Sequence, residues 1–277
     1  MARIGVQAMM LRDEVARNGA LATFARAAEA GYRVTELSQI PMTEQNLAEL
    51  ERARGDVGTE FCSISLSLDG SEDLVKTVSD AKRLGARLVR IGMIPFDALA
   101  SLDEIIGFAR RADEAATFLA DHGIELYYHN HHVEFARIGG ELLLDIISHA
   151  SPNVGLELDA HWIARGGMDP ARVIEKYAGQ VKMVHLKDYR IALPDGSAFA
   201  ARERGDHDAW DRAWNGLVQF AEVGEGNLDW PGIIEQSLAS GAEYLLVEQD
   251  LLYGRTVWEA LETSRRNLIA LGYAHLF

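Results

Sequence analysis

One pattern of polar and apolar positions recurs along the chain: an amphipathic segment, a glycine with one neighbour, and a short β-branched or apolar run. The clearest copies of the final run are residues 34–37, 88–91, 124–126 and 244–247. The glycine suits the left-handed residue that commonly ends a helix. Each run has the length of a buried strand. The pattern therefore predicts helices that alternate with strands.

Four further runs, residues 3–7, 60–65, 154–159 and 181–187, bring the strand candidates to eight. A segment long enough for a helix follows each of them. Between the fourth and fifth strand candidates, apolar residues have the 3.6-residue spacing of a helix with one buried face. They are Ile105, Ala109, Ala112, Ala116 and Leu119. Eight alternating units predict an α/β fold, the closed parallel (β/α)8 TIM barrel. The alternative is an open doubly wound sheet, but the Gly-x-Gly-x-x-Gly turn of its usual dinucleotide-binding form is missing.

The 277 residues suit one barrel of about 250 residues or two ordinary domains. No linker or low-complexity stretch divides the sequence, so we expect a single barrel domain over residues 1–277. The one long irregular segment, residues 189–229, follows the seventh strand. In a barrel this position faces the active site. We therefore expect the segment to cover the pocket or to contact a neighbouring subunit, with Trp210 or Trp214 as an anchor.

The net charge of the chain argues against two classes of binding partner. Lys and Arg number 27 against 42 Asp and Glu, which gives a formal net charge of -15. This field repels phosphate backbones and anionic lipids, so neither nucleic acid nor a membrane is an expected partner. The single Cys62 lies in a strand-like run and cannot form an internal disulfide. Since there is no signal-peptide pattern and no apolar run of roughly 18 residues, we expect a cytoplasmic protein.

Polar side chains that can bind metal close the last four strands. The stretches are Tyr128-His129-Asn130-His131-His132-Val133-Glu134, Leu156-Glu157-Leu158-Asp159, His185-Leu186-Lys187-Asp188 and Val247-Glu248-Gln249-Asp250. TIM-barrel active sites are built where strands end, so these groups are expected at one mouth. Carboxylates and imidazoles without a thiolate suit one divalent ion, Mn2+ first, or Mg2+, Co2+ or Zn2+. A cation also offsets the repulsion between crowded carboxylates.

With these motifs the sequence resembles the xylose-isomerase-like barrel superfamily. Within it, the chain is similar to the sugar phosphate isomerase/epimerase group related to inosose dehydratases and ketose 3-epimerases. The resemblance covers nearly the whole chain and includes Val223-Gly224-Glu225-Gly226 and Asp229-Trp230. It implies metal ligands Glu, Asp, His and Glu from strands five to eight, and the last three correspond here to Asp159, His185 and Glu248.

The fifth-strand ligand departs from this pattern. Where many members of the group have Glu at the strand end, this chain has His129, and the nearest carboxylate is Glu134. We expect Glu134 to be the metal ligand and His129 or His131 to act as acid and base. A histidine ligand is the alternative.

Other residues near the strand ends have two interpretations each. Glu157 points the same way as Asp159, either as a partner behind the metal ligands or paired with Lys187. Glu36 closes the second strand and either reaches a substrate hydroxyl or forms a rim salt bridge. Trp162 either forms an aromatic wall for a sugar ring or packs. Lys187 is expected on the substrate side, and Glu248 is expected to act in catalysis as well as in metal binding.

These residues predict metal-assisted proton abstraction next to the carbonyl of a keto-sugar or related polyol, as in a sugar isomerase or epimerase. The alternative is a lyase that acts by β-elimination on a 3-keto-glycoside or inosose, because an imidazole can serve as base and then protonate a leaving oxygen.

There are two remote alternatives. One is an apurinic endonuclease-like enzyme, which needs further histidines that the third and fourth strands lack, and the other is a non-catalytic sugar-binding barrel. No Gly-rich phosphate cradle or Arg cluster marks the loops, which favours an unphosphorylated substrate. The partner is thus a small sugar, and a homo-oligomer is compatible with the sequence.

Overall fold

Eight parallel strands close into a barrel in the computed structural model, which describes residues 2–70 and 73–277. Around the barrel the strands are β1 (Arg3–Gln7), β2 (Val34–Leu37), β3 (Glu60–Leu66), β4 (Leu88–Ile91), β5 (Glu125–His129), β8 (Gly155–Asp159), β9 (Val181–Leu186) and β12 (Tyr244–Val247). β12 pairs with β1 and completes the closure. The (β/α)8 TIM barrel predicted from the alternating pattern is confirmed.

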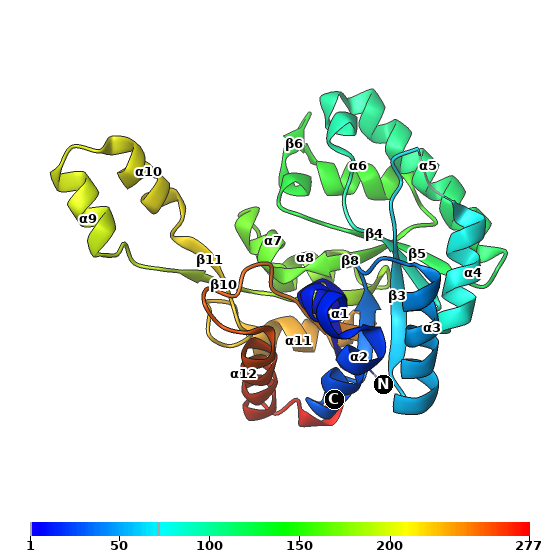
Figure 1. Cartoon of the computed structure of the whole chain (residues 1–277). Coiled ribbons are helices and arrows are strands. Elements are labelled where there is room, and N and C mark those ends of the chain that lie inside the picture. Colours follow the sequence, from blue (N-terminus) through cyan, green and yellow to red (C-terminus); the bar gives the residue numbers. More distant parts are fainter. Residues whose placement is uncertain (1, 71–72) are drawn as a thin grey trace.

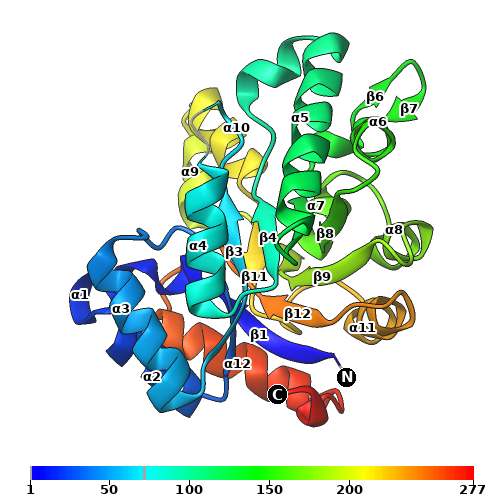
Figure 2. The same cartoon turned by 90° about the vertical axis from the view of Figure 1, so that its right-hand side faces the viewer.

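Helices form the outer layer of the barrel. They are α1 (Arg12–Asn18), α2 (Ala20–Glu29), α3 (Glu44–Arg52), α4 (Leu74–Leu84), α5 (Leu102–Ala120), α6 (Leu143–Ala150), α7 (Ala160–Arg165), α8 (Pro170–Lys176), α11 (Trp230–Ala239) and α12 (Val257–Ala270). Figure 2 shows α3, α4 and α5 along one flank, and both views place the two termini at the end where the strands begin (Figure 1). None of the helices in the described ranges is long and apolar enough to cross a bilayer.

The helices follow the sequence pattern closely. The predicted inward face of α5 is buried at Ile105, Ala109, Ala112, Ala116 and Leu119. Ser101 caps the start of α5, because its side chain accepts a hydrogen bond from the backbone N–H of Glu104. Gly85 ends α4 in the left-handed conformation, with φ of 71°. The repeated glycine therefore marks a real helix end at this position.

Inside the barrel, strand residues two positions apart point the same way and build layers. One layer is apolar and contains Val34, Cys62, Leu88, Tyr127, Met183, Tyr244 and Leu246. Burial raises the pKa of the Cys62 thiol, as expected for a strand residue. Two positions further along four of these strands lie Glu36, Arg90, His185 and Glu248, which are also buried. The barrel is thus apolar where its strands begin and ionic where they end.

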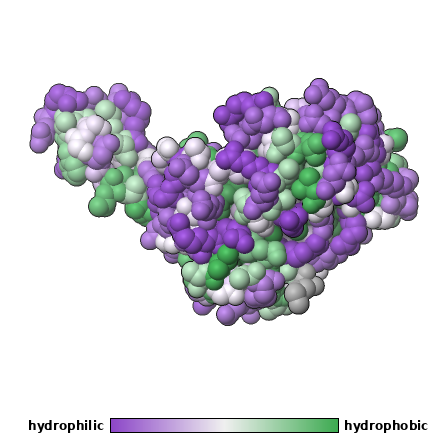
Figure 3. Space-filling view, turned by 60° about the horizontal axis from the view of Figure 1, so that its bottom comes forward, coloured by the Kyte–Doolittle hydropathy of each residue, from purple (hydrophilic) through white to green (hydrophobic). Residues whose placement is uncertain are grey.

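The segment after β9 is regular, so the prediction of an irregular loop was wrong. β10 (Asp188–Ile191) and β11 (Val218–Ala221) form an antiparallel pair, and between them lie α9 (Gly196–Glu203) and α10 (His207–Asn215). Residues 188–221, which we call the arm, project away from the barrel (Figure 1). Apolar surface gathers where the arm leaves the barrel (Figure 3). At the end of β10, Ile191 and Leu193 are exposed.

Candidate functional site

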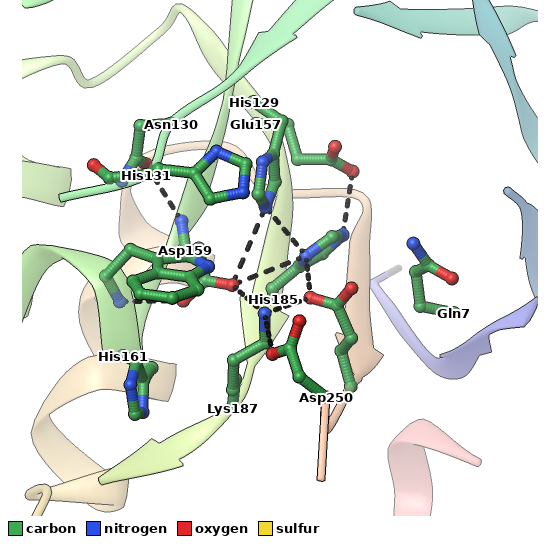
Figure 4. Close-up of polar contacts among 12 residues, drawn as sticks. Gln7, His129, Asn130, His131, Glu157, Asp159, His161, His185, Lys187 and Asp250 are labelled. Carbon is green, nitrogen blue, oxygen red and sulfur yellow. Dashed lines mark hydrogen bonds and ion pairs between the residues drawn. The ribbon is translucent and has the colours of Figure 1, made fainter. Parts of the chain in front are cut away.

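Four buried side chains converge at the mouth of the barrel: His129 and Asp159 at the ends of β5 and β8, His185 on β9, and Glu248 just after β12. One ligand-type atom from each lies within 4.8 Å of the others. His185 Nδ1 lies 2.8 Å from Glu248 Oε2 and 3.1 Å from His129 Nε2 (Figure 4). Asp159 Oδ2 lies 3.6 Å from a nitrogen of each imidazole. We call these four residues the metal group.

The chemistry of the metal group fits one divalent ion. Two imidazoles and two carboxylates form a mixed nitrogen and oxygen donor set. Asp159 Oδ2 is buried and accepts no hydrogen bond of good geometry from the described residues, although a buried carboxylate oxygen normally accepts one, and it forms an ion pair with Lys187 Nζ at 3.1 Å. The other oxygen, Oδ1, accepts from the backbone N–H of Trp162 at 2.9 Å and so fixes the carboxylate. The group is therefore a candidate metal site.

Each imidazole of the metal group is oriented by a contact on its far side. His129 Nδ1 lies 3.2 Å from the backbone oxygen of Gly92, an acceptor, so this nitrogen carries the proton and Nε2 faces the group. His185 Nε2 lies 3.1 Å from Glu157 Oε1 and 3.4 Å from Glu36 Oε2, which leaves Nδ1 facing the group. Partners of this kind fix the tautomer of a metal-binding histidine.

Burial and charge set the protonation of these side chains. Burial lowers the pKa of His129 to about 4, so its ring is neutral near pH 7. For His185, burial acts the same way, but Glu157, Glu248 and Glu36 outweigh it and raise the pKa. Negative charge is therefore concentrated around His185, where a cation is favoured.

Lys187 is a buried cation beside the metal group. Its Nζ lies 2.7 Å from Glu248 Oε2, 2.8 Å from Asp250 Oδ2 and 3.1 Å from Asp159 Oδ2. Burial lowers the pKa of the ammonium, but these three carboxylates outweigh burial and raise it. Lys187 is thus a fixed positive charge, and it lines the cavity over the metal group.

A second ionic cluster lies behind the metal group. Arg90 Nε is 2.6 Å from Glu36 Oε1 and 3.5 Å from Glu157 Oε2. Glu36 is fully buried, does not line the cavity and pairs with Arg90, which favours the salt-bridge interpretation over contact with a substrate hydroxyl. Glu157 contacts Arg90 and His185, the arrangement of a partner behind the ligands. Burial and the neighbouring Glu36 raise the pKa of Glu157 to about 8.

Glu134 lies apart from the metal group. Its Oε1 accepts from the Tyr128 hydroxyl at 2.5 Å, and its Oε2 accepts from the backbone N–H of His131 at 2.8 Å. The chain has already left β5 at this point and forms a short 3-10 helix, η4 (Val133–Phe135), which turns the carboxylate back onto Tyr128. His129, the last residue of β5, takes the fifth-strand position instead. This geometry favours the histidine alternative over Glu134.

A cavity of about 580 Å³ opens over the metal group. On one side it is lined by His129, His131, Lys187, Glu248 and Asp250. His131 Nδ1 is buried without a hydrogen-bond partner, and burial lowers the pKa of this ring to about 3. A neutral imidazole with an unused nitrogen therefore stands beside the metal group.

Trp162 and the arm do not line this cavity. The Trp162 ring lies 5.2 Å from the His131 ring and 5.1 Å from Lys187 Nζ, so it packs behind both residues. The expectation that residues 189–229 cover the pocket of their own chain is wrong, since none of these residues, all of them described, belongs to the lining.

Three residues of the site were not assigned a role from the sequence: Gln7, Arg90 and Asp250. Gln7 ends β1, and its Oε1 accepts from the backbone N–H of Met9, which leaves the buried Nε2 without a partner at the cavity. Arg90 lies in β4 between apolar neighbours. A polar residue on the inward-facing positions of a barrel strand is the signal that identifies Gln7 and Arg90. Asp250 follows Glu248 by two residues and shares its direction.

The Gly-rich motif after β11, Val223-Gly224-Glu225-Gly226, has a structural role. The Asp188 carboxylate accepts from the backbone N–H groups of Gly224 at 2.9 Å and Gly226 at 3.0 Å, and from Trp230 Nε1 at 2.7 Å. A Cβ on Gly226 would lie 2.2 Å from Asp188 Oδ1, so only glycine fits there. Asp188 thus fastens the start of α11 to the end of β9, next to the metal group.

Comparison with known proteins agrees with this geometry. The family model described as xylose isomerase-like TIM barrel matches residues 24–252. The chain belongs to the xylose isomerase-like TIM barrel family. The resemblance inferred from the strand-end motifs is thereby confirmed.

The individual relatives and solved structures that match the chain have low sequence identity to it. The rhizopine catabolism protein MocC of Rhizobium meliloti is 28% identical over 149 residues, which are 53% of this chain and 43% of MocC. The match thus spans less than half of that relative. The structure of L-ribulose 3-epimerase has a TM-score of 0.70 at 20% identity and covers 100% of this chain and 96% of its own. The probable 3-DHS dehydratase AsbF from Bacillus anthracis has a TM-score of 0.66 at 17% identity, covering 97% and 99%. These structures show a shared fold.

Proposed function

We propose that this chain is a divalent-metal-dependent sugar isomerase or epimerase that moves a proton next to the carbonyl of a keto-sugar or related polyol. The proposal rests on the convergence of His129, Asp159, His185 and Glu248, whose ligand-type atoms all lie within 4.8 Å of one another. In this proposal these four side chains hold the ion, and His129 replaces the expected Glu134. When bound, the ion polarises the substrate carbonyl and a neighbouring hydroxyl. An L-ribulose 3-epimerase with the same fold supports a sugar substrate.

His131 is the proposed base. Its neutral ring lines the cavity, and its Nδ1 forms no hydrogen bond with any residue that the structure describes. The ring centroid lies 4.9 Å from that of His129, so a substrate held at the metal group is within reach of the imidazole. Glu248 lines the same cavity and is the proposed second proton carrier. Two carriers on opposite faces of the substrate would give epimerisation, whereas one carrier serving adjacent carbons would give isomerisation.

Lys187 is the proposed stabiliser of the substrate oxygen. Its ammonium is held by Asp159, Glu248 and Asp250 and still reaches the cavity. A cation fixed in this way acts on an oxygen that gains negative charge as the carbon proton leaves. Glu157 and Gly92 keep the two imidazoles of the metal group in their metal-binding tautomers.

A lyase is the second candidate. His131 faces the cavity, so its imidazole can take the carbon proton and then give that proton to the departing oxygen. The shared fold of a probable dehydratase supports elimination as a reaction of this barrel. Both candidates begin with removal of the same carbon proton. They differ in the next step, which is either return of a proton to carbon or loss of the oxygen substituent.

Solvent exchange tests the proposal. Protein reconstituted with Mn2+ is incubated with a panel of keto-sugars in deuterated water, and products are examined by NMR and mass spectrometry. We expect deuterium at the carbon next to the carbonyl, with a stereoisomer or positional isomer as product. Deuterium with loss of water or of an aglycone identifies the lyase. No exchange with any keto-sugar, by protein that binds about one ion per chain, contradicts both candidates.

Two variants locate the chemistry in that assay. His131→Gln should suppress exchange while the bound metal stays at the wild-type level, since His131 is outside the metal group. His149→Gln, on α6 and exposed, is the matched control and should leave exchange unchanged. Exchange at the full rate in His131→Gln would assign the proton to another residue.

A further inference from the structure

The cavity continues beyond the metal group to the ends of β1, β2, β3 and β4. We infer that this part of the cavity takes an uncharged sugar that carries an apolar substituent, such as an aryl glycoside, in preference to a free or phosphorylated monosaccharide. The inference rests on the proposed function, because it names the substrate class of the same site.

Charge argues against a phosphate. Among the described residues that line the cavity, the only Lys or Arg side chains are Arg90 and Lys187. Arg90 is held by Glu36 and Glu157, and Lys187 is held by three carboxylates. Glu248 and Asp250 line the same space, so a dianion entering it meets negative charge and no cation that lacks a carboxylate partner.

The wall opposite the metal group matches hydroxyl groups. Gln7 is fully buried at the end of β1, and its Nε2 has no hydrogen-bond partner among residues 2–70 and 73–277 (Figure 4). Because Met9 N–H donates to the Oε1 atom, the amide orientation is fixed and a donor faces the cavity. Ser38, Ser65 and Ser67 add hydroxyl groups to the lining. Uncharged donors and acceptors of this kind bind a polyol without a net charge.

The rim of the cavity is apolar. Met9, Leu68, Met93, Pro95 and Phe96 all belong to the lining. Phe96 is 77% exposed, at the start of the short helix η3 (Phe96–Ala100) that follows β4. A large aromatic side chain kept exposed at the edge of a polar cavity offers a flat surface to an apolar or aromatic group.

Size agrees with a substituted sugar. The cavity measures about 580 Å³. Small-molecule sites typically measure about 300–1,000 Å³ and take ligands of drug size, whereas a hexose has only about twelve non-hydrogen atoms. A single sugar ring at the metal group would leave the space beside Phe96 unfilled. A substituent on the ring would fill it and cover the aromatic face.

Binding measurements test the inference without turnover. Isothermal titration compares glucose, glucose 6-phosphate, methyl β-glucoside and 4-nitrophenyl β-glucoside on protein loaded with Mn2+. We expect the aryl glucoside to bind about tenfold more tightly than the methyl glucoside, the size of a good aromatic contact, and the phosphate to bind more weakly than glucose. Phe96→Ala should remove the aryl preference and leave the Kd for methyl glucoside unchanged.

Val75→Ala is the matched control, since Val75 is 71% exposed on α4 and does not line the cavity. It should keep the aryl preference. Equal Kd values for the aryl and methyl glucosides, an aryl preference that survives Phe96→Ala, or tighter binding of the phosphate would each overturn the inference. The exchange assay is run on the same protein. Exchange without aryl preference refutes only this inference, and aryl preference without exchange refutes only the proposed function.

Discussion

The two halves of the barrel mouth differ in charge. The ends of β5, β8, β9 and β12 bring ionisable groups together, among them Asp159, Lys187 and Glu248, all of them buried. Toward the cavity, the ends of β1, β2 and β3 contribute mainly amide and hydroxyl groups such as Gln7 and Ser65, together with the Asp69 carboxylate, while Glu36 of β2 lies behind the metal group. One half therefore has the groups that move protons and hold cations, and the other has groups that recognise a neutral polyol.

Only the charged half of the barrel mouth carries a free-energy cost of burying charge. A buried carboxylate without a compensating charge is strongly unfavourable, so the charged half is stable only with cations placed among its carboxylates. Arg90 and Lys187 supply two of them, and the single ammonium of Lys187 is shared by Asp159, Glu248 and Asp250. The neutral half has no such demand and can remain open to solvent. Variants in the two halves should therefore change different measurements.

The largest effect is expected for Asp159→Asn. The variant loses one of the two carboxylates of the metal group. Polarisation by a metal contributes several kcal/mol, so exchange should fall by at least about 1,000-fold. Metal content is measured by mass spectrometry and exchange by NMR. Asp145→Asn, an ion-paired aspartate on α6, is the control and should keep both. Wild-type metal content in Asp159→Asn would disprove the assignment.

The next effect separates His129 from Glu134. His129→Ala should weaken metal affinity by more than about 100-fold, beyond what the loss of a partner behind a ligand costs. Glu134→Gln should leave the affinity unchanged and lower stability by about 1 kcal/mol, since it weakens the contacts to Tyr128 and His131. Metal titration and chemical denaturation measure the two quantities. The reverse order of metal affinities would restore Glu134 as the ligand.

A smaller effect is expected for Glu157→Gln. Glu157 contacts the far nitrogen of His185, and loss of such a partner typically weakens metal affinity by about 10–100-fold while the ligands stay in place. The measurement is the Kd for Mn2+. Glu125→Gln, at the start of β5 and paired with Lys182, is the control. An unchanged Kd in Glu157→Gln would mean that His185 is oriented by Glu36 alone.

A substitution in the neutral half of the barrel mouth should change KM. Gln7→Ala removes one neutral hydrogen bond to substrate, about 0.5–1.5 kcal/mol, so KM should rise by roughly three- to tenfold with metal content unchanged. Steady-state kinetics on the best keto-sugar of the exchange panel measures it. Gln45→Ala, on the exposed face of α3, is the control. A fall in metal content in Gln7→Ala would show that the two halves are not separate.

Much of this site could be predicted from the sequence because it depends on strands alone. Asp159, His185 and Glu248 each follow an apolar run at an inward-facing position, so the runs that predict the strands also predict these residues. Four strands have the predicted bounds, three differ at one end by one residue, and the largest difference is at β5, predicted over 124–126 and observed as Glu125–His129. That small shift is the reason for proposing His129 as the fifth-strand ligand, because it makes His129 the last strand residue and leaves Glu134 on η4.

Other features depend on closure of the barrel, which no local pattern contains. Arg90 lies between apolar neighbours in β4, and only the closed barrel shows that it meets Glu36 and Glu157. The helices of the arm have a weak signal for another reason. α9 and α10 contact mainly each other, so no long apolar face identifies them, and Gly196, Gly205 and Gly216 interrupt the segment.

The smallest effect on the barrel is expected from the arm. α9 and α10 have 8 and 9 residues, lengths that are marginal for isolated helices, and α10 buries none of its side chains. Phe199 and Trp214 are exposed, and Trp214 stacks on Trp210 at 5.8 Å. Because every copy of the chain has the same arm, pairing two arms would cover both apolar surfaces at once, and we expect a homo-oligomer held by this contact.

The double variant Phe199→Ser with Trp214→Ser tests that contact. Neither side chain lines the cavity, so exchange and metal content should stay at wild-type levels, and substitutions of this kind change barrel stability by no more than about 0.5 kcal/mol. Sedimentation velocity should show a wild-type oligomer and a monomeric variant. Val75→Ser, an exposed apolar position on α4, is the control and should leave the oligomer intact. A wild-type protein that sediments as a monomer at all concentrations, or a variant that still associates, would show that the arm has another role.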